Sequence, residues 1–130
     1  MSKHVKALIF GAGAQGRVIL DILRAQSRYD SIEFIDDNET LWGQFVNGAP
    51  VAGNFDYAHQ QDQGTSRMII AVGNPVLRLS IARKAREYAI PFLNAVHPSS
   101  VIMPTVTLGE GNMISALAVI NSNSVIGDNV

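Results

Sequence analysis

The chain has 130 residues, of which 47% are hydrophobic and 16% charged, a balance that suits a soluble globular protein with one compact domain and a small appendage. Its net charge is −1 and it contains no basic block, so we expect neither nucleic acid nor a membrane surface as a partner. The absence of cysteine excludes disulfides, thiolate metal sites and a cysteine nucleophile. Because the apolar run before Gly11 is also too short for a signal peptide or a membrane span, we expect a cytoplasmic protein.

Short apolar stretches alternate with amphipathic ones over the first three quarters of the chain. Four stretches have the composition of buried strands: 5–10, 32–35, 68–72 and 92–96. Two have apolar residues at helical spacing: 14–26 and 75–88. Glycine and proline predict a loop over 41–53, and the polar stretch 56–63 predicts at most a short helix outside the core. Strands that alternate with helices indicate an α/β fold with a parallel sheet and right-handed crossovers, here about half of a doubly wound fold.

A six-residue period begins after His97 and Pro98. The aliphatic residues that recur with this period are Ile102, Leu108, Ile114, Ile120 and Ile126. Four positions after each of them comes a small side chain, a β-branched side chain or Asn: Val106, Asn112, Ala118, Ser124 and Val130. This period predicts a triangular parallel β-helix with inward-pointing aliphatics, in which Ile102 stacks on Ile120 and Leu108 on Ile126, about 4.8 Å apart. An ordinary polar loop is the alternative, although loops need no fixed period.

These two patterns divide the chain into a Rossmann-like domain over residues 1–97 and the first coils of a β-helix over residues 98–130. Residues 102–130 amount to fewer than two coils, and a solenoid normally needs about three repeats and a capping end. We therefore expect the natural polypeptide to continue beyond Val130.

A glycine-rich sequence, Gly11-Ala12-Gly13-Ala14-Gln15-Gly16, lies between the first expected strand and the first expected helix. In this context the first glycine permits a tight turn, the second admits a phosphate to the backbone, and the third lets the helix pack against the strand. The helix N-terminus offers N–H groups and a partial positive charge to a diphosphate. Asp36 ends the second strand, where a carboxylate can accept a hydrogen bond from a ribose or a base. A turn whose glycines serve packing alone, with Asp36 and Asp37 as solvated surface, is the alternative.

A similar turn, Gly73-Asn74-Pro75, ends the third expected strand at the same edge of the sheet. Ligands of open parallel sheets bind beyond the carboxyl ends of the strands, so Gly73 and Asn74 are expected to border the same site. Capping of the following helix by Asn74 is an equally good interpretation. Arg78, one turn into that helix, could reach an anion, although we expect it to face water.

The three histidines do not suggest a catalytic arrangement. His4 and His59 lie in polar surroundings and are expected to be exposed, whereas His97 precedes Pro98, where a role in a turn is expected. No Ser/His/Asp set, paired-carboxylate site or metal-ligand cluster can be assembled from the sequence. We therefore expect no catalytic residue and no metal site within this chain.

Together these motifs resemble the sugar O- and N-acyltransferases of the sialic-acid O-acetyltransferase type, which act in bacterial surface-glycan synthesis. The resemblance covers essentially the whole chain, in order, and rests on segments 11–16, 34–37, 48–53, 71–74 and 96–99 and on the hexapeptide repeats. It implies a homotrimer in which each subunit has a Rossmann-like domain for a nucleotide-linked amino sugar. A left-handed β-helix would follow and bind acetyl-CoA between neighbouring subunits. A histidine on the β-helix would act as general base, deprotonating the amine or hydroxyl of the sugar for attack on the thioester.

The resemblance assigns a set of residues to substrate binding. The diphosphate would lie along Gly11, Gly13, Gln15 and Gly16, the nucleoside on Asp36 and Asp37, and the border of the site at Gly73 and Asn74. The family often has histidine where this chain has Gln15. Its catalytic histidine lies in later repeats, and residues 102–130 contain none, so we expect the general base and the acetyl-CoA site on coils beyond Val130.

The leading hypothesis is the sugar-nucleotide-binding part of an acetyltransferase that moves an acetyl group from acetyl-CoA to the amine or hydroxyl of a UDP- or GDP-linked amino sugar. The glycine loop and Asp36 alone would also permit a small NAD-binding oxidoreductase domain. A non-catalytic nucleotide-binding module is a third hypothesis. The hexapeptide repeats and the lack of a candidate proton donor count against the oxidoreductase.

Overall fold

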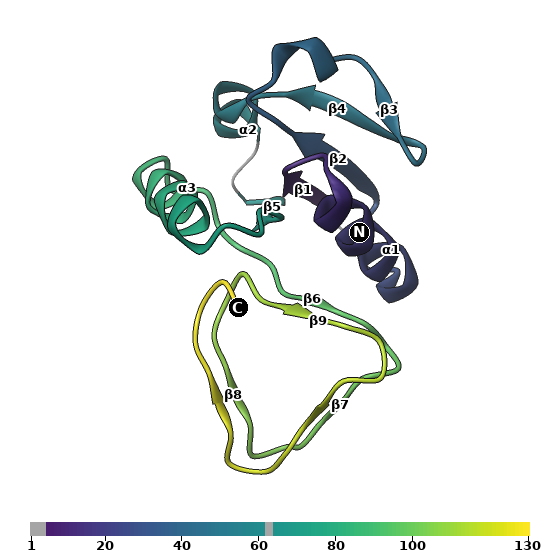
Figure 1. The fold of residues 1–130 in the computed structure, drawn as a ribbon, viewed down its shortest axis with the longest axis vertical. Coiled ribbons are helices and arrows are strands. Elements are labelled where there is room, and N and C mark those ends of the chain that lie inside the picture. Colours follow the sequence, from purple (N-terminus) through teal and green to yellow (C-terminus); the bar gives the residue numbers. More distant parts are fainter. Residues whose placement is uncertain (1–4, 62–63) are drawn as a thin grey trace.

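A computed structural model of the chain describes residues 5–61 and 64–130, and consists of an α/β unit followed by a triangular coil of short strands (Figure 1). Within these residues, the α/β unit contains a five-stranded sheet with the order β3-β4-β2-β1-β5. Strands β1, β2, β4 and β5 run parallel, and β3 pairs with β4 in the antiparallel direction. The predicted fold class, a parallel α/β sheet followed by a β-helix, is confirmed.

The central strands and helices form where the sequence predicted them. Strand β1 covers Lys6–Phe10, helix α1 covers Ala14–Gln26 and strand β2 covers Ser31–Ile35. On the other side of β1, β5 covers Ser66–Ile70 and leads into α3 over Pro75–Glu87. Both neighbours pair with β1 along its whole length, so the carboxyl ends of the three strands meet at one edge of the sheet.

Alternate residues of β1 pack against opposite layers of helices. Ala7 and Ile9 are fully buried in the core that α1 covers. Leu8 and Phe10 are buried on the opposite face, in the core formed with α3 and with α2, which covers Phe55–Gln60. Because strand side chains alternate between the two faces, β1 has apolar residues at nearly every position, as expected for a strand covered on both sides.

The loop predicted over 41–53 is wrong for most of its length. A short 3-10 helix, η1, covers Glu39–Leu41, after which β3 covers Phe45–Val46 and β4 covers Ala49–Gly53. Asn47 and Gly48 both have positive φ, 48° and 84°, as a two-residue hairpin turn requires. Strand β4 then pairs with β2 and buries alternate residues. Asn-Gly is a hairpin signal, but the frequent glycine and the proline in this stretch favoured the loop interpretation.

The short helix predicted over 56–63 lies against the core rather than outside it. Asn54 caps α2, because its side chain accepts hydrogen bonds from backbone N–H groups of the first turn. Phe55 is buried, and its ring lies 4.9 Å from that of Phe10. Two buried residues, Phe55 and Ala58, thus anchor a helix whose other residues are partly or fully exposed. Residues 62 and 63, the end of the predicted segment, lie outside the described residues.

The six-residue period forms the predicted β-helix. Within the described residues its strands pair in parallel, β6 with β9, β7 with β10 and β8 with β11. The strands β6 to β11 cover Ala95–Val96, Val101–Ile102, Thr107–Leu108, Met113–Ile114, Val119–Ile120 and Val125–Ile126. The predicted stacking is confirmed, since Ile120 pairs with Ile102 and Ile126 with Leu108.

The strand predicted over 92–96 belongs only in part to the sheet. Phe92 forms a single parallel bridge with Met68 of β5, whereas the last two residues form β6 and pair with β9. Val96 thereby stacks on Ile114. The repeat therefore starts six residues before Ile102, at Val96, and with this earlier strand residues 95–130 form two triangular turns.

Asparagine side chains tie the two turns of the β-helix together. Asn94 Oδ1 accepts a hydrogen bond from the Asn112 N–H (2.8 Å), and Asn112 Oδ1 accepts one from the Val130 N–H (2.6 Å). Their side-chain amides donate to the carbonyl oxygens of Gly109 (2.8 Å) and Gly127 (2.7 Å). Asn112 is fully buried, so the pairing of its polar groups is what makes its burial favourable.

Candidate functional site

The glycine loop lies at the carboxyl edge of the sheet, between the ends of β2 and β5. The Gly11 N–H donates to the Ile35 carbonyl at the end of β2, and the Ala71 N–H, after β5, donates to the Phe10 carbonyl, both at 2.7 Å. Gly11 has a φ of +111°, and a Cβ there would lie 2.7 Å from the Ala71 carbonyl oxygen. Only glycine therefore fits this tight turn.

Gly16 and Gly13 have different surroundings. A Cβ on Gly16 would overlap the Gly11 carbonyl oxygen and lie 3.0 Å from Phe34, so this glycine lets α1 pack closely. Gly13 is exposed, and an added Cβ would have no atom within 4 Å. It is the N-cap of α1, without a side-chain cap, and the first turn contains no acidic residue. Open space and the N–H groups of a helix start are therefore present together at Gly13.

The Asp36 carboxylate holds the glycine loop against the end of β2. Its Oδ2 accepts a hydrogen bond from the Ala12 N–H (3.0 Å), and its Oδ1 accepts one from the Asn38 N–H (2.9 Å). Trp42 Nε1 donates to the Asp36 carbonyl oxygen at 2.8 Å. No pattern in the sequence predicts these bonds. They leave each carboxylate oxygen a further lone pair for a ribose or a base. Asp37 is exposed beside it.

The turn after β5 approaches the glycine loop from the other side. Gly73 is exposed, and a Cβ there would lie 3.6 Å from Gln15 Oε1, so the structure brings these two residues together. Asn74 Oδ1 accepts hydrogen bonds from the N–H groups of Val76 and Leu77, both at 3.0 Å. Asn74 therefore caps α3, as its alternative interpretation predicted.

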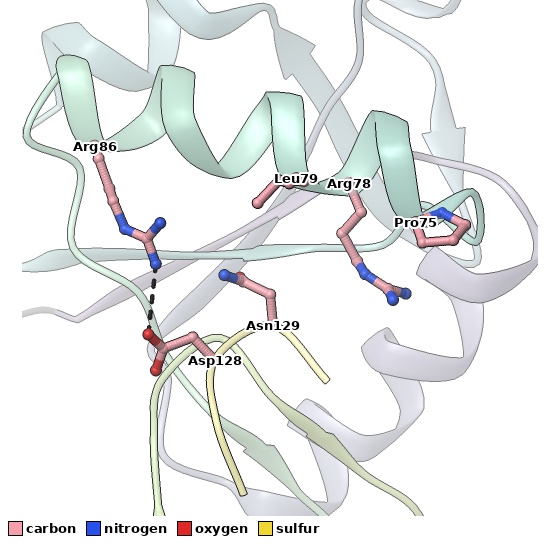
Figure 2. A pocket seen from close by; sticks show the side chains of 6 residues that line it. All are labelled: Pro75, Arg78, Leu79, Arg86, Asp128 and Asn129. Atoms are coloured by element: carbon pink, nitrogen blue, oxygen red, sulfur yellow. Dashed lines mark ion pairs between the residues drawn. The ribbon is translucent and has the colours of Figure 1, made fainter.

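A cleft of about 420 Å³ lies between α3 and the last turn of the β-helix (Figure 2). Arg78 and Arg86 extend into it from α3, and Asp128 and Asn129 line the opposite wall. Arg86 pairs with Asp128 at 3.6 Å. Arg78 is half-buried, contrary to the expectation that it faces water, and its Nη1 lies 3.5 Å from the Val72 carbonyl oxygen. Pro75, the first residue of α3, also lines the cleft and lies two residues after Gly73.

Two of the three histidines are among the described residues. His59 is exposed, as expected, with its ring 5.1 Å from that of Tyr88. His97 Nδ1 accepts a hydrogen bond from the Ser99 N–H (3.0 Å), which agrees with the predicted role in a turn. His4 lies outside the described residues.

The described part of the chain contains neither a metal site nor a membrane-spanning helix. Over residues 5–61 and 64–130, no three carboxylate or histidine side chains are grouped so that they could hold a metal ion. None of the helices in these ranges is long and apolar enough to cross a membrane.

The sequence has relatives among characterised acetyltransferases. Residues 6–85 match the family of the PglD N-terminal domain. UDP-N-acetylbacillosamine N-acetyltransferase of Bacillus subtilis (strain 168) is 30% identical over 111 residues, which are 83% of this chain and 50% of that protein. The chain spans about half the length of the curated relatives it matches.

Two solved structures have this fold over nearly the whole chain. The acetyltransferase domain of PglB from Neisseria gonorrhoeae FA1090, in complex with acetyl coenzyme A, has a TM-score of 0.89 and 29% identity, covering 98% of this chain and 60% of that one. The second is a histidine-to-asparagine variant of perosamine N-acetyltransferase from Caulobacter crescentus, in complex with CoA and GDP-perosamine. It has a TM-score of 0.85 and 36% identity, and the match covers 95% of this chain and 58% of that one. The resemblance to the N-terminal portion of such enzymes is confirmed. Because the family match covers well over half of its residues, the chain belongs to the PglD N-terminal domain family.

Proposed function

We propose that this chain is the sugar-nucleotide-binding part of an acetyl-CoA-dependent acetyltransferase of bacterial glycan synthesis. Its acceptor is the amine or hydroxyl of a UDP- or GDP-linked amino sugar. The observation that carries the proposal is the open helix start at Gly13, with the Asp36 carboxylate beside the same loop. The named activities and bound molecules of the relatives support acetyl-CoA as co-substrate and a nucleotide-linked amino sugar as acceptor.

The proposed binding mode follows the edge of the sheet from β2 to β5. The diphosphate lies over the loop and the helix start, on Gly11, Gly13, Gln15 and Gly16. The nucleoside lies at the end of β2, where Asp36 and Asp37 accept its hydrogen bonds. Gly73 and Asn74 form the border at the end of β5, so the sugar extends toward the cleft between α3 and the β-helix.

Acetyl transfer joins the acceptor nitrogen or oxygen to the acetyl carbonyl carbon and breaks the bond from that carbon to the CoA sulfur. A general base must take the proton of the acceptor, and histidine suits this task because its pKa lies near neutral pH. Residues 102–130 contain no histidine. We therefore place the base, and the site for acetyl-CoA, on β-helix coils that these residues do not supply.

The outer faces of the β-helix support assembly into a homotrimer. Val101 and Val119 stack in register on one outer face and are 48% and 61% exposed, and Val125 on the next face is 75% exposed. Contact with a neighbouring subunit would remove this apolar surface from water. Light scattering of the full enzyme should give three times the subunit mass, and a monomer would contradict the trimer.

We also place the enzyme in the cytoplasm. The chain contains no cysteine, which suits a reducing compartment. Fractionation of cells that produce the tagged protein tests this, because recovery in a membrane or periplasmic fraction would contradict it.

Calorimetric titration with UDP-sugars, GDP-sugars and NAD tests the proposed function. A nucleotide sugar should bind and NAD should not, because the proposed site extends from the nucleoside toward a sugar cleft. Preferential binding of NAD would favour the oxidoreductase hypothesis. Binding of nucleotides without any dependence on the sugar would favour the non-catalytic module.

A further inference from the structure

Arg78 lies at the junction of the glycine loop and the cleft. It is in the first turn of α3, and its guanidinium extends into the cleft (Figure 2). Its Nη1 lies 3.5 Å from the carbonyl oxygen of Val72. The Val72 side chain in turn would lie 3.6 Å from a Cβ placed on Gly11. Val72 therefore lies next to both this guanidinium and the glycine loop.

The positive charge of Arg78 has no carboxylate partner in the part of the chain that the structure describes. Arg86, which extends into the same cleft, is paired with Asp128 at 3.6 Å. Removing a charged group from water without a partner is unfavourable, and ordering a long side chain costs conformational entropy. A half-buried arginine in such surroundings is poised to bind an anion.

The order of the strands indicates which part of a nucleotide sugar would reach Arg78. Strand β1 lies between β2 and β5, so Asp36 at the end of β2 and Arg78 beside the end of β5 are on opposite sides of the glycine loop. If the nucleoside lies at Asp36 and the diphosphate over the loop, the phosphate farther from the nucleoside lies on the side of Arg78. That is the phosphate that carries the sugar.

We propose that Arg78 binds the sugar-bearing phosphate of the nucleotide sugar, an inference that rests on the proposed function. A planar guanidinium donates two parallel N–H···O hydrogen bonds to one phosphate and neutralises part of its charge. Arg78 acts as a positioning residue, because holding this phosphate directs the attached sugar into the cleft between α3 and the β-helix.

The test compares nucleoside diphosphates with monophosphates, because only a diphosphate has the phosphate assigned to Arg78. By calorimetry, the parent chain should bind UDP or GDP more tightly than UMP or GMP. Arg78→Gln should weaken diphosphate binding by roughly 10- to 100-fold, the range expected for a charged hydrogen-bond partner. It should leave monophosphate binding nearly unchanged, so the preference for the diphosphate over the monophosphate shrinks by the same factor. Arg78→Lys, which keeps a point charge, should retain part of the preference.

Arg83→Gln is the matched control, because Arg83 is exposed on the same helix and does not line the cleft. It should keep the preference of the parent. Thermal unfolding checks that each variant folds, which we expect because the 3.5 Å contact with Val72 is too long to contribute much stability. An unchanged preference in Arg78→Gln would overturn the role of Arg78 and leave the proposed function standing. A parent chain that binds no nucleotide would overturn the proposed function, and this inference with it.

Discussion

The space around each Cα atom of the glycine loop determines what a substitution does there. Gly16 lies against the Gly11 carbonyl and Phe34, so a larger residue must displace α1. Gly13 faces open space and has a φ of −89°, which any residue can adopt. The two positions therefore separate an effect on folding from an effect on binding.

Gly13→Val should abolish nucleotide-sugar binding, because its side chain occupies the space proposed for the diphosphate. It should cost no more than about 1 kcal/mol of stability, since valine is only a poorer N-cap than glycine. Urea unfolding and calorimetric titration measure the two effects. Gly16→Val is the control for an effect on folding. Its side chain would overlap the Gly11 carbonyl oxygen, so this variant should not fold stably. If Gly13→Val binds as tightly as the parent, the loop serves packing alone.

Asp36→Ala should affect both stability and binding, because the carboxylate accepts hydrogen bonds from Ala12 and Asn38. We expect a loss of about 1–3 kcal/mol in binding free energy, the contribution of a charged hydrogen-bond partner. The free energy of unfolding should fall as well, since the loop loses its attachment to β2. Asp37→Ala, which removes an exposed carboxylate, should leave stability unchanged. Unchanged affinity in Asp36→Ala would move the nucleoside site to Asp37 or elsewhere.

Among the elements, α2 is joined to the sheet by a polar cluster of Lys6, Glu33 and Tyr57. Lys6 Nζ lies 2.6 Å from Glu33 Oε1, and the Tyr57 hydroxyl donates to Glu33 Oε2 at 2.7 Å. Burial lowers the pKa of Lys6, but the hydrogen bond and the negative charge of Glu33 outweigh it, so this pKa is raised. Burial and, next, the hydrogen bond to Glu33 raise the pKa of Tyr57. The cluster is therefore favoured while Lys6 and Tyr57 keep their protons.

The raised pKa values of Lys6 and Tyr57 predict that the fold loses stability at alkaline pH. A group whose pKa is raised by folding stabilises the fold below its unfolded pKa, and the contribution disappears as the pH rises through the folded pKa. Because lysine and tyrosine titrate near pH 10 in the unfolded chain, stability should fall above about pH 10. Glu33→Gln should lower stability at pH 8 and make the alkaline fall shallower. Urea midpoints between pH 8 and alkaline pH measure this, and an equally steep fall in Glu33→Gln would assign it to other groups.

The elements that the sequence predicted well are those with a long pattern of their own. Helix α1 spans 13 residues with an amphipathic repeat, and its bounds, Ala14–Gln26, are those predicted. The six-residue repeat was recognised for the same reason. Strand β4 and helix α2 are short, and contacts with β2 and with Phe10 stabilise them. Such tertiary contacts have little local sequence signal, so the sequence alone predicts a loop in place of β4 and a position outside the core for α2.

The sequence predicted the position of the glycine loop in the fold but not the contacts of the residues around it. A glycine loop between a strand and a helix has a fixed geometry, so the sequence located it at the carboxyl edge of the sheet. The hydrogen bonds of Asp36 to Ala12 and of Trp42 to Asp36 join segments far apart in the chain, and no spacing predicts them. The same holds for Arg78, which lines a cleft together with Asp128 and Asn129 of the β-helix.

In the whole molecule, the β-helix is packed against the α/β unit on both sides of the sheet edge. The Val96 N–H donates to Gln26 of α1 at 3.4 Å, and Met113 of β9 packs against the core that α1 covers. On the other side, Arg86 of α3 pairs with Asp128. The β-helix is thus attached near the ends of α1 and α3, and its last turn forms one wall of the cleft along α3.

The 130-residue chain is accordingly expected to bind a nucleotide sugar but to transfer no acetyl group. General-base catalysis needs a titratable group within hydrogen-bond reach of the acceptor, and no histidine lies on a repeat between 102 and 130. His97 Nδ1 is already engaged by the Ser99 N–H. A thiol-release assay with acetyl-CoA and UDP- and GDP-linked amino sugars measures transfer, with a full-length relative and its own substrate as the positive control. Turnover by this chain that is lost in His97→Ala would show that the base is His97 and that its placement on later coils is wrong.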